Sequence, residues 1–302
     1  MENGKGRVWS LAKLRKLALF GKMSRVMAEP NKYEAVWVSH SSMGDFLACP
    51  RLYYLRAIYK DPVAGHKITL MQPPLALGQI VHEVVEGLSL LPVEERFKKS
   101  LLDKFEVAWK KVEGRKGGFT SRDEEEKQKE RGRNMLSRIM KNPGPVGRKA
   151  IKIKQDLPYY WLSEEENIIL CGKVDWLEYL EETDGVHVMD FKTGKWEEKE
   201  TSLQLPIYHL LVTNTQKRKV EKTSYWYLDK NDEPTEQKLP DLEKAHEDIM
   251  MVAKRMKLAR SLEHFKCPKN GCRHCLPMEE IIKGKGERVG ISEYNQDIYV
   301  LV

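Results

Sequence analysis

The chain has 302 residues, of which 41% are hydrophobic, and this length suits one large domain with insertions. No apolar run is long enough for a transmembrane helix, which argues against a membrane-spanning protein, and we expect no membrane partner. The net charge of +7 is mildly basic. Such a balance is compatible with a polyanionic partner, although it does not establish one.

The first segment, residues 1–35, is expected to be a basic extension. Seven lysines and arginines but only one acidic residue precede Glu29. Apolar residues at helical spacing favour an amphipathic helix there. Because a basic, acid-poor segment resembles an organellar transit peptide, import through residues 1–28 stays open beside the cytoplasmic location that we expect. A later start site and a DNA-contacting tail are the alternatives.

Residues 41–60 are expected to be helical, with a break near Pro50. Basic residues and tyrosines alternate through this segment: Arg51, Arg56 and Lys60 lie among Tyr53, Tyr54 and Tyr59. Aromatic rings among cations can stack nucleobases while the cations hold phosphates. An amphipathic helix whose tyrosines belong to the core explains the pattern equally well.

Residues 75–140 are expected to be mainly helical. Apolar residues recur at helical spacing in residues 77–88, and His82 lies at the edge of this stripe, one turn before Glu86. On the residues alone, an isolated histidine in such a place is more often structural than a ligand, and Glu86 is a weak candidate for a supporting role. Asn-Pro-Gly-Pro at 142–145 ends the helical region.

Strands are predicted next, at residues 151–157, 168–180 and 186–192. Asp184 and Gly185 form a strong turn signal between the last two strands, and this signal predicts a β-hairpin.

The hairpin would gather two carboxylates and a lysine. Strand periodicity places Asp190 and Lys192 on one face, roughly 7 Å apart along the backbone. Asp175, on the preceding apolar run, would lie beside Asp190. This combination suits a Mg²⁺ site that activates water against a phosphodiester. A surface hairpin with solvated charges is the alternative, but it does not account for acids on otherwise apolar strands.

Gln204 and Tyr208 are four residues apart, so a helix places them on one face. Thr201 or Ser202 can cap this helix, with Pro206 near its first turn. The two side chains would border the hairpin site. Core packing for Tyr208 and a capping or surface role for Gln204 are the alternatives.

The rest of the chain completes an α/β pattern. Strands are expected at residues 223–228, 235–239 and 297–302, and a long helix at 241–261.

Cysteine usage is the second signal. Cys267, Cys272 and Cys275 cluster after the long helix, whereas Cys49 stands in a Cys-Pro context more than two hundred residues earlier. Four thiolates suit a [4Fe–4S] cluster or a structural zinc. Disulfides fit poorly with a chain that shows no secretory signal.

Three other residues could be considered as ligands of this metal centre. His264 and His274 are less favoured ligands. Cys171, within an apolar strand, is expected to be a buried small hydrophobe.

Four motifs, in order, resemble the RecB-like branch of the PD-(D/E)XK nuclease superfamily. They are Gly-Gln-Ile-Val-His at 78–82, Gly-Lys-Val-Asp at 172–175, Asp-Phe-Lys-Thr-Gly at 190–194 and Gln-Leu-Pro-Ile-Tyr at 204–208. Asp-x-Lys alone is a weak signal, but the ordered set is strong. The resemblance implies a mixed central sheet flanked by helices, with a RecB-like nuclease domain at 36–302 and a helical insertion at about 83–147.

The resemblance also implies site roles. His82, Asp175 and Asp190 would hold one or two Mg²⁺ or Mn²⁺ ions, with the carbonyl of Phe191 as an extra ligand. Lys192 would position the attacking hydroxide and offset charge in the transition state. Gln204 and Tyr208 would contact the scissile strand or orient Lys192.

One cysteine near the N-terminus and three near the C-terminus resemble the iron–sulfur subgroup of this branch, which includes AddB-type nuclease domains and CRISPR-adaptation exonucleases. In that subgroup Cys-x2-Cys usually precedes a later cysteine, whereas here a four-residue gap precedes a two-residue gap and no cysteine follows Cys275. Zinc at Cys49, Cys267, Cys272 and Cys275 therefore stays open.

The subgroup implies an exonuclease that acts on single-stranded DNA ends in DNA repair, recombination or CRISPR spacer acquisition, with protein partners in such a complex. Two other function classes remain. One is a catalytically silent DNA-end-binding subunit, and the other is a zinc-dependent nucleic-acid-binding module.

Overall fold

The computed structural model describes residues 31–153 and 155–301. Most of the predicted basic extension therefore lies outside the described residues. The labelled helices are α2 (His40–Ala48), α3 (Pro50–Tyr53), α4 (Pro73–Glu86), α5 (Leu101–Trp109), α6 (Arg122–Lys141), α7 (Gln204–Thr215), α8 (Leu242–Ser261) and α9 (Leu276–Glu280). The strands are β1 (Val36–Val38), β2 (Lys67–Leu70), β3 (Tyr159–Ser163), β4 (Ile168–Cys171), β5 (Trp176–Leu180), β6 (Gly185–Lys192), β7 (Val220–Tyr227), β8 (Thr235–Gln237), β9 (Gly286–Ile291) and β10 (Gln296–Leu301).

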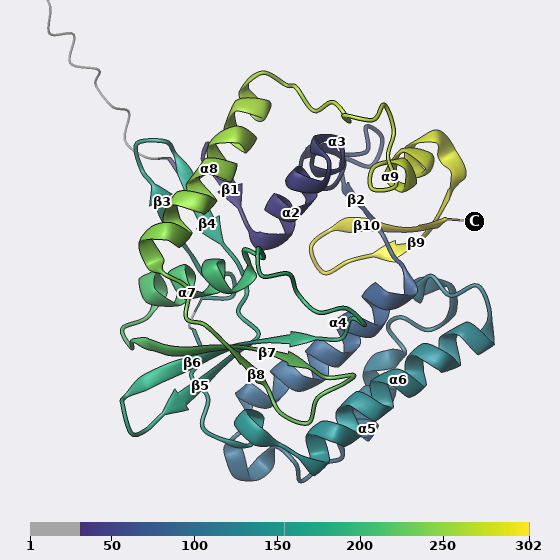
Figure 1. Ribbon diagram of the computed structural model, residues 1–302. Helices are drawn as coiled ribbons and strands as arrows, with labels where there is room; N and C mark the ends of the chain where they lie inside the picture. Colours follow the sequence, from purple (N-terminus) through teal and green to yellow (C-terminus); the bar gives the residue numbers. More distant parts are fainter. Residues whose placement is uncertain (1–30, 154, 302) are drawn as a thin grey trace, which may run out of the picture.

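A four-stranded mixed sheet of order β5-β6-β7-β8 carries the predicted hairpin (Figure 1). Strands β5 and β6 are antiparallel, with Trp176 opposite Met189. At the turn between them Asp184 adopts a φ of 49°, the left-handed conformation that aspartate tolerates better than most residues. Strand β7 then pairs parallel to β6, and α7 lies in the connection between them.

The prediction of one strand over residues 168–180 is wrong, because the chain breaks between β4 and β5. Strand β4 pairs with β1 and β3 in a second sheet, whereas β5 belongs to the hairpin sheet. Gly172 opens the break, and a Cβ atom there would stand 3.0 Å from Leu211 Cδ1 on α7. The close approach of α7 therefore favours glycine where the chain leaves one sheet for the other.

The strand predicted at residues 151–157 is not present among the described residues of that segment. Only Ala150 forms an isolated bridge, to Glu178. Ile151 and Ile153 instead pack against the hydrophobic core as parts of a connecting segment, so their apolar character reflects partial burial without strand pairing.

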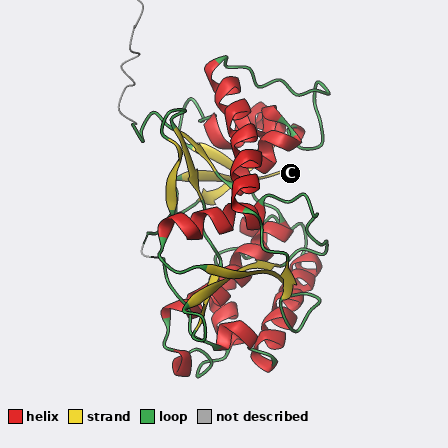
Figure 2. Cartoon of the chain, turned by 60° about the vertical axis from the view of Figure 1, so that its left-hand side comes forward, coloured by secondary structure: helices red, strands yellow, loops and turns green. Residues whose placement is uncertain are grey.

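The two faces of β6 pack into two different cores, and Figure 2 shows its sheet between helices. Met189 and Phe191 join the cluster that contains residues of α4, α5 and α6. Val186 and Val188 join the cluster that contains residues of α7 and α8. Side chains along a strand point alternately to its two faces, so Asp190 lies on the same face as Val186 and Val188, toward α7 and at the end of β6.

The last two strands, β9 and β10, form a third sheet with an early strand, β2. Strand β10 pairs parallel with β2, and Gln296 lies opposite Lys67. A third hydrophobic cluster beside this sheet contains Cys49 and Cys275. The expected α/β architecture is confirmed: mixed sheets are flanked by helices, and Cys49 lies close to three cysteines from the C-terminal part of the chain.

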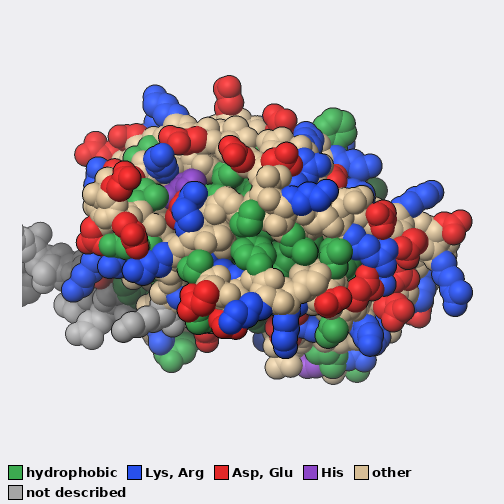
Figure 3. Space-filling model, turned by 90° about the horizontal axis from the view of Figure 1, so that it is seen from below, with side chains coloured by type: hydrophobic (Ala, Val, Ile, Leu, Met, Phe, Trp, Pro, Cys, Tyr) green, Lys and Arg blue, Asp and Glu red, His purple; other side chains and the backbone are tan. Residues whose placement is uncertain are grey.

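The described surface shows no single dominant charge on the face seen from below (Figure 3). Hydrophobic side chains gather in the middle of this face, and basic and acidic side chains surround them. The basic excess of the chain is therefore not concentrated there. Among the described residues, no helix combines the length and the apolar character that a membrane span needs.

Candidate active site

The hairpin brings Asp175 beside Asp190, at the end of the sheet where β5 begins and β6 ends. Asp175 immediately precedes β5, and its Oδ2 accepts a hydrogen bond from the backbone N–H of Phe191 at 2.9 Å. Asp190 is 4% exposed on β6. Strand pairing fixes the position of Asp190, whereas Asp175 is held one residue before β5 by the hydrogen bond from Phe191.

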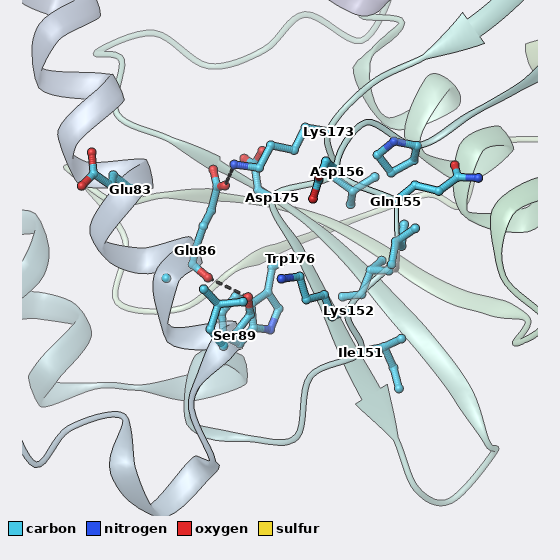
Figure 4. Close-up of a pocket in the computed structure, with 16 residues that line it drawn as sticks. Glu83, Glu86, Ser89, Ile151, Lys152, Gln155, Asp156, Lys173, Asp175 and Trp176 are labelled. Atoms are coloured by element: carbon cyan, nitrogen blue, oxygen red, sulfur yellow. Dashed lines mark hydrogen bonds and ion pairs between the residues drawn. The ribbon is translucent and has the colours of Figure 1, made fainter. Parts of the chain in front are cut away.

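Helix α4 supplies a histidine to the same place. His82 Nδ1 lies 3.5 Å from Asp175 Oδ2 and 3.0 Å from Glu86 Oε1. The ligand atoms of His82, Glu86 and Asp175 all lie within 4.8 Å of one another, close enough to hold one metal ion. Lys173 Nζ contacts Glu86 Oε2 at 2.5 Å, and Figure 4 shows these side chains beside Asp175 at the rim of a pocket.

Lys192 forms a buried ion-pair group on the other side of Asp190. Its Nζ lies 2.9 Å from Asp190 Oδ2 and 2.9 Å from Glu198 Oε1. The ammonium also lies 5.2 Å from the centre of the Tyr225 ring. Lys192 is thereby held with its charge directed at Asp190, the arrangement expected of strand positions two residues apart.

The site gathers several acidic side chains, and two of them, Asp175 and Asp190, are buried. Burial, with the neighbouring Asp190, raises the pKa of Asp175 to about 7, and burial also raises the pKa of Asp190. Burial opposes protonation of His82, but Asp175 and Glu86 outweigh it and raise the pKa of His82 to about 9. A bound divalent cation would offset this repulsion, and carboxylates with an imidazole fit Mg²⁺ or Mn²⁺.

Tyr208 reaches the site from α7. Its hydroxyl donates a hydrogen bond to Asp175 Oδ1 at 3.1 Å, so both oxygens of Asp175 are engaged. Gln204 begins α7, is 7% exposed, and lies beside the side chain of His40. The cap expected from Thr201 or Ser202 is not found: Leu203 is the N-cap residue and no side chain caps the helix, although the Gln204 N–H donates to Ser202 Oγ at 3.3 Å.

Sequence reasoning missed three polar neighbours of the site. Glu198 comes from a charged segment without periodicity, and no pattern in the sequence points to its contact with Lys192. Lys173 stands inside the Gly-x-x-Asp motif, so its position could have drawn attention. His40 is the first residue of α2 and resembles an ordinary surface residue in the sequence. Burial and the nearby Lys192 lower its pKa.

The four predicted cysteines form a second candidate metal centre. Ligand atoms of Cys49, Cys267, Cys272 and Cys275 all lie within 4.8 Å of one another, and all four residues are free cysteines. Cys272 Sγ lies 3.7 Å from Cys275 Sγ, and backbone N–H donation lowers the pKa of Cys272 to about 7. Four converging thiols fit a cluster or a zinc ion, whereas neither His264 nor His274 belongs to this group.

Local structure explains how Cys49 reaches the centre. Helix α2 ends at Ala48, its C-cap Cys49 adopts an extended conformation with φ −168°, and Pro50 begins α3. Proline favours the first position of a helix and cannot continue the preceding one. Cys171, in contrast, lies in β4, where its thiol contacts Val38 O at 3.5 Å, and burial raises its pKa to about 11.

Comparison with known proteins places the chain in a family. A family model described as the PD-(D/E)XK nuclease superfamily matches residues 37–278. The matched range includes both the hairpin site and the four cysteines. No curated protein matches the chain.

Proposed function

The chain belongs to the PD-(D/E)XK nuclease superfamily, and from this premise we propose that it is a metal-dependent deoxyribonuclease that acts as an exonuclease on single-stranded DNA ends. One observation carries the proposal: Asp175, Asp190 and Lys192 meet at one buried edge of the sheet, with His82 beside them. The proposed action on DNA ends rests on the resemblance to the iron–sulfur subgroup. The convergence of four cysteines supports that resemblance.

In this proposal, His82, Asp175 and Asp190 hold the cation, with the carbonyl of Phe191 as a further ligand. Glu86 is an additional candidate, because the ligand atoms that lie within 4.8 Å of one another belong to His82, Glu86 and Asp175, and Asp190 lies outside that group. The bound cation supplies Lewis acidity and lowers the pKa of water. Lys192 stabilises the charge that develops on the phosphoryl oxygens. Its ion pairs with Asp190 and Glu198 keep it protonated, since they outweigh the effect of burial and raise its pKa.

The α7 residues act as supports in the same scheme. Tyr208 holds Asp175 in one orientation by donating a hydrogen bond to its Oδ1. Gln204 is the first residue of α7, where it can contact the scissile strand. Outer partners of this kind fix the orientation of a ligand and its basicity.

The ion requirement tests the proposal directly. We expect Mg²⁺ and Mn²⁺ to support cleavage, with Mn²⁺ the better because histidine suits it more. Ca²⁺ should permit DNA binding with little cleavage, because it is larger and prefers a looser coordination shell. The measurement is digestion of an end-labelled oligonucleotide with each ion, and full activity in excess EDTA would exclude the metal mechanism.

Tyr208→Phe should reduce cleavage about tenfold or more, because it removes a hydrogen bond that orients a metal ligand. The matched control is Tyr160→Phe. The Tyr160 hydroxyl is buried and has no hydrogen-bond partner among the described residues. Its removal should therefore leave activity unchanged. Equal losses in steady-state digestion by the two variants would show that Tyr208 acts only through packing.

The cysteine centre is proposed to hold a [4Fe–4S] cluster, with zinc as the alternative. It would fasten the two ends of the domain across a loop of more than two hundred residues, a closure whose entropy is otherwise costly. The biological setting that we propose is DNA repair, recombination or CRISPR spacer acquisition, with DNA and the proteins of such a complex as partners.

A further inference from the structure

A surface pocket of about 520 Å³ lies between α3 and the end of α8, beside the cysteine centre. Six residues line it, and they combine cations with aromatic rings: Arg51, Tyr54, Ile58, Arg260, Glu263 and Phe265. We propose that this pocket binds a nucleobase and its phosphate from the single-stranded DNA, several nucleotides away from the scissile bond. This inference rests on the proposed nuclease function and adds a second contact with the strand.

The aromatic part of the pocket is already arranged as a stacking platform. The rings of Tyr54 and Phe265 lie 5.2 Å apart with an interplanar angle of 31°. The guanidinium of Arg51 lies 5.2 Å from the centre of the Tyr54 ring. All three side chains are partly exposed. A base can therefore stack on this group without any rearrangement of the core, and stacking accepts every base because each has a π face.

The charge of the pocket suits a phosphate. Arg51 engages Glu279 through Nε at 3.0 Å, and its terminal nitrogens make no hydrogen bond to the described residues. Arg260 is exposed and donates through Nη1 to the Tyr53 hydroxyl at 3.2 Å. Residues 264–274, which continue from the pocket to the cysteines, contain Lys266, Lys269 and Arg273 and no acidic residue. The one carboxylate, Glu263, can accept a hydrogen bond from an exocyclic amino group of a base.

Helix α2 connects the pocket to the active site. Its first residue, His40, lies beside Gln204 and Lys192, and its last residue, Ala48, is followed by the segment that supplies Arg51 and Tyr54. A helix of nine residues spans about 14 Å. At the spacing of about 3.4 Å per phosphate in a stacked strand, this distance corresponds to roughly four nucleotides, and a more extended single strand covers it with fewer. A strand of ordinary length can thus occupy both places, whereas a dinucleotide cannot.

The test compares a 16-nucleotide strand with a dinucleotide as substrates for the full chain. The variant is Tyr54→Leu with Phe265→Leu, which keeps apolar volume and removes stacking. The matched control is Tyr33→Leu, because Tyr33 is 87% exposed and carries Lys32 at 5.2 Å from its ring, but lies outside the pocket. Metal content and melting temperature are measured for each protein, so that damage to the cysteine centre is detected.

We expect the double variant to raise KM for the 16-nucleotide strand about tenfold and to leave kcat/KM for the dinucleotide within about twofold of the wild-type value. The control should change neither. A KM for the long strand equal to that of the wild type would overturn the proposal. Equal losses on both substrates would also overturn it, because the residues would then act through the fold.

A second measurement does not depend on the variants folding well. A series of 16-nucleotide strands, each with one 2-aminopurine, is bound to the wild type in Ca²⁺. Stacking in the pocket should quench fluorescence most at one position several nucleotides from the strand end, whereas uniform quenching would contradict the proposal. Binding without hydrolysis in Mn²⁺ would instead reject the nuclease function and leave the binding pocket standing.

Discussion

Asp190→Ala and Lys192→Ala should each abolish DNA cleavage and leave DNA binding largely intact. The first change removes a carboxylate from the metal site and the partner of Lys192. The second removes a preorganised positive charge, which is commonly worth about 3 kcal/mol or more in the transition state, so the rate should fall at least about a hundredfold. The measurements are digestion of an end-labelled strand in Mn²⁺ and the dissociation constant for the same strand in Ca²⁺.

The matched control for these two variants is Asp232→Ala. Asp232 forms an ion pair with Arg138 at 3.1 Å and its side chain is 62% exposed, so its removal should not change the rate. Wild-type digestion by a clean preparation of Asp190→Ala would refute the assignment of the site. Loss of DNA binding together with cleavage would show that the two residues act on the fold.

Cys49→Ser should remove the bound metal of the cysteine centre and lower the melting temperature about as strongly as Cys275→Ser. Both residues are fully buried and contribute to one group of four thiols. Because a serine hydroxyl is a poor ligand for iron or zinc, either change breaks the same closure between the two ends of the domain. Iron and zinc analysis, visible absorption and thermal unfolding measure the effect.

Cys171→Ser is the matched control, since Cys171 is also buried but lies outside that group. It should leave colour and metal content unchanged. Its cost in the free energy of unfolding should be only that of a polar substitution in a buried strand, on the order of 1–2 kcal/mol. Retention of full metal content by Cys49→Ser would contradict the assignment of Cys49 to the centre.

The sequence predicted the elements of the site that depend on short-range rules. The turn at Asp184 and Gly185 and the alternation along β6 were enough to place Asp175 beside Asp190. The approach of Cys49 to three cysteines more than two hundred residues away was predicted through the family resemblance, because no local rule links such distant residues.

Features that depend on tertiary packing could not be predicted. The break at Gly172 follows from the close approach of Leu211 on α7, which periodicity in one segment does not reveal. The contact between Lys192 and Glu198 arises in an irregular segment, where no spacing rule applies. Likewise, Ile151 and Ile153 are apolar because they pack against the core, and a strand would show the same alternation.

The central claim is most directly tested by digestion of linear and circular single-stranded DNA of the same sequence with the purified chain in Mn²⁺. The account predicts progressive shortening of the linear strand from an end, resistance of the circle, and loss of activity in EDTA. Absence of any metal-dependent cleavage of either substrate, by a protein that retains its cysteine-bound metal, would contradict it.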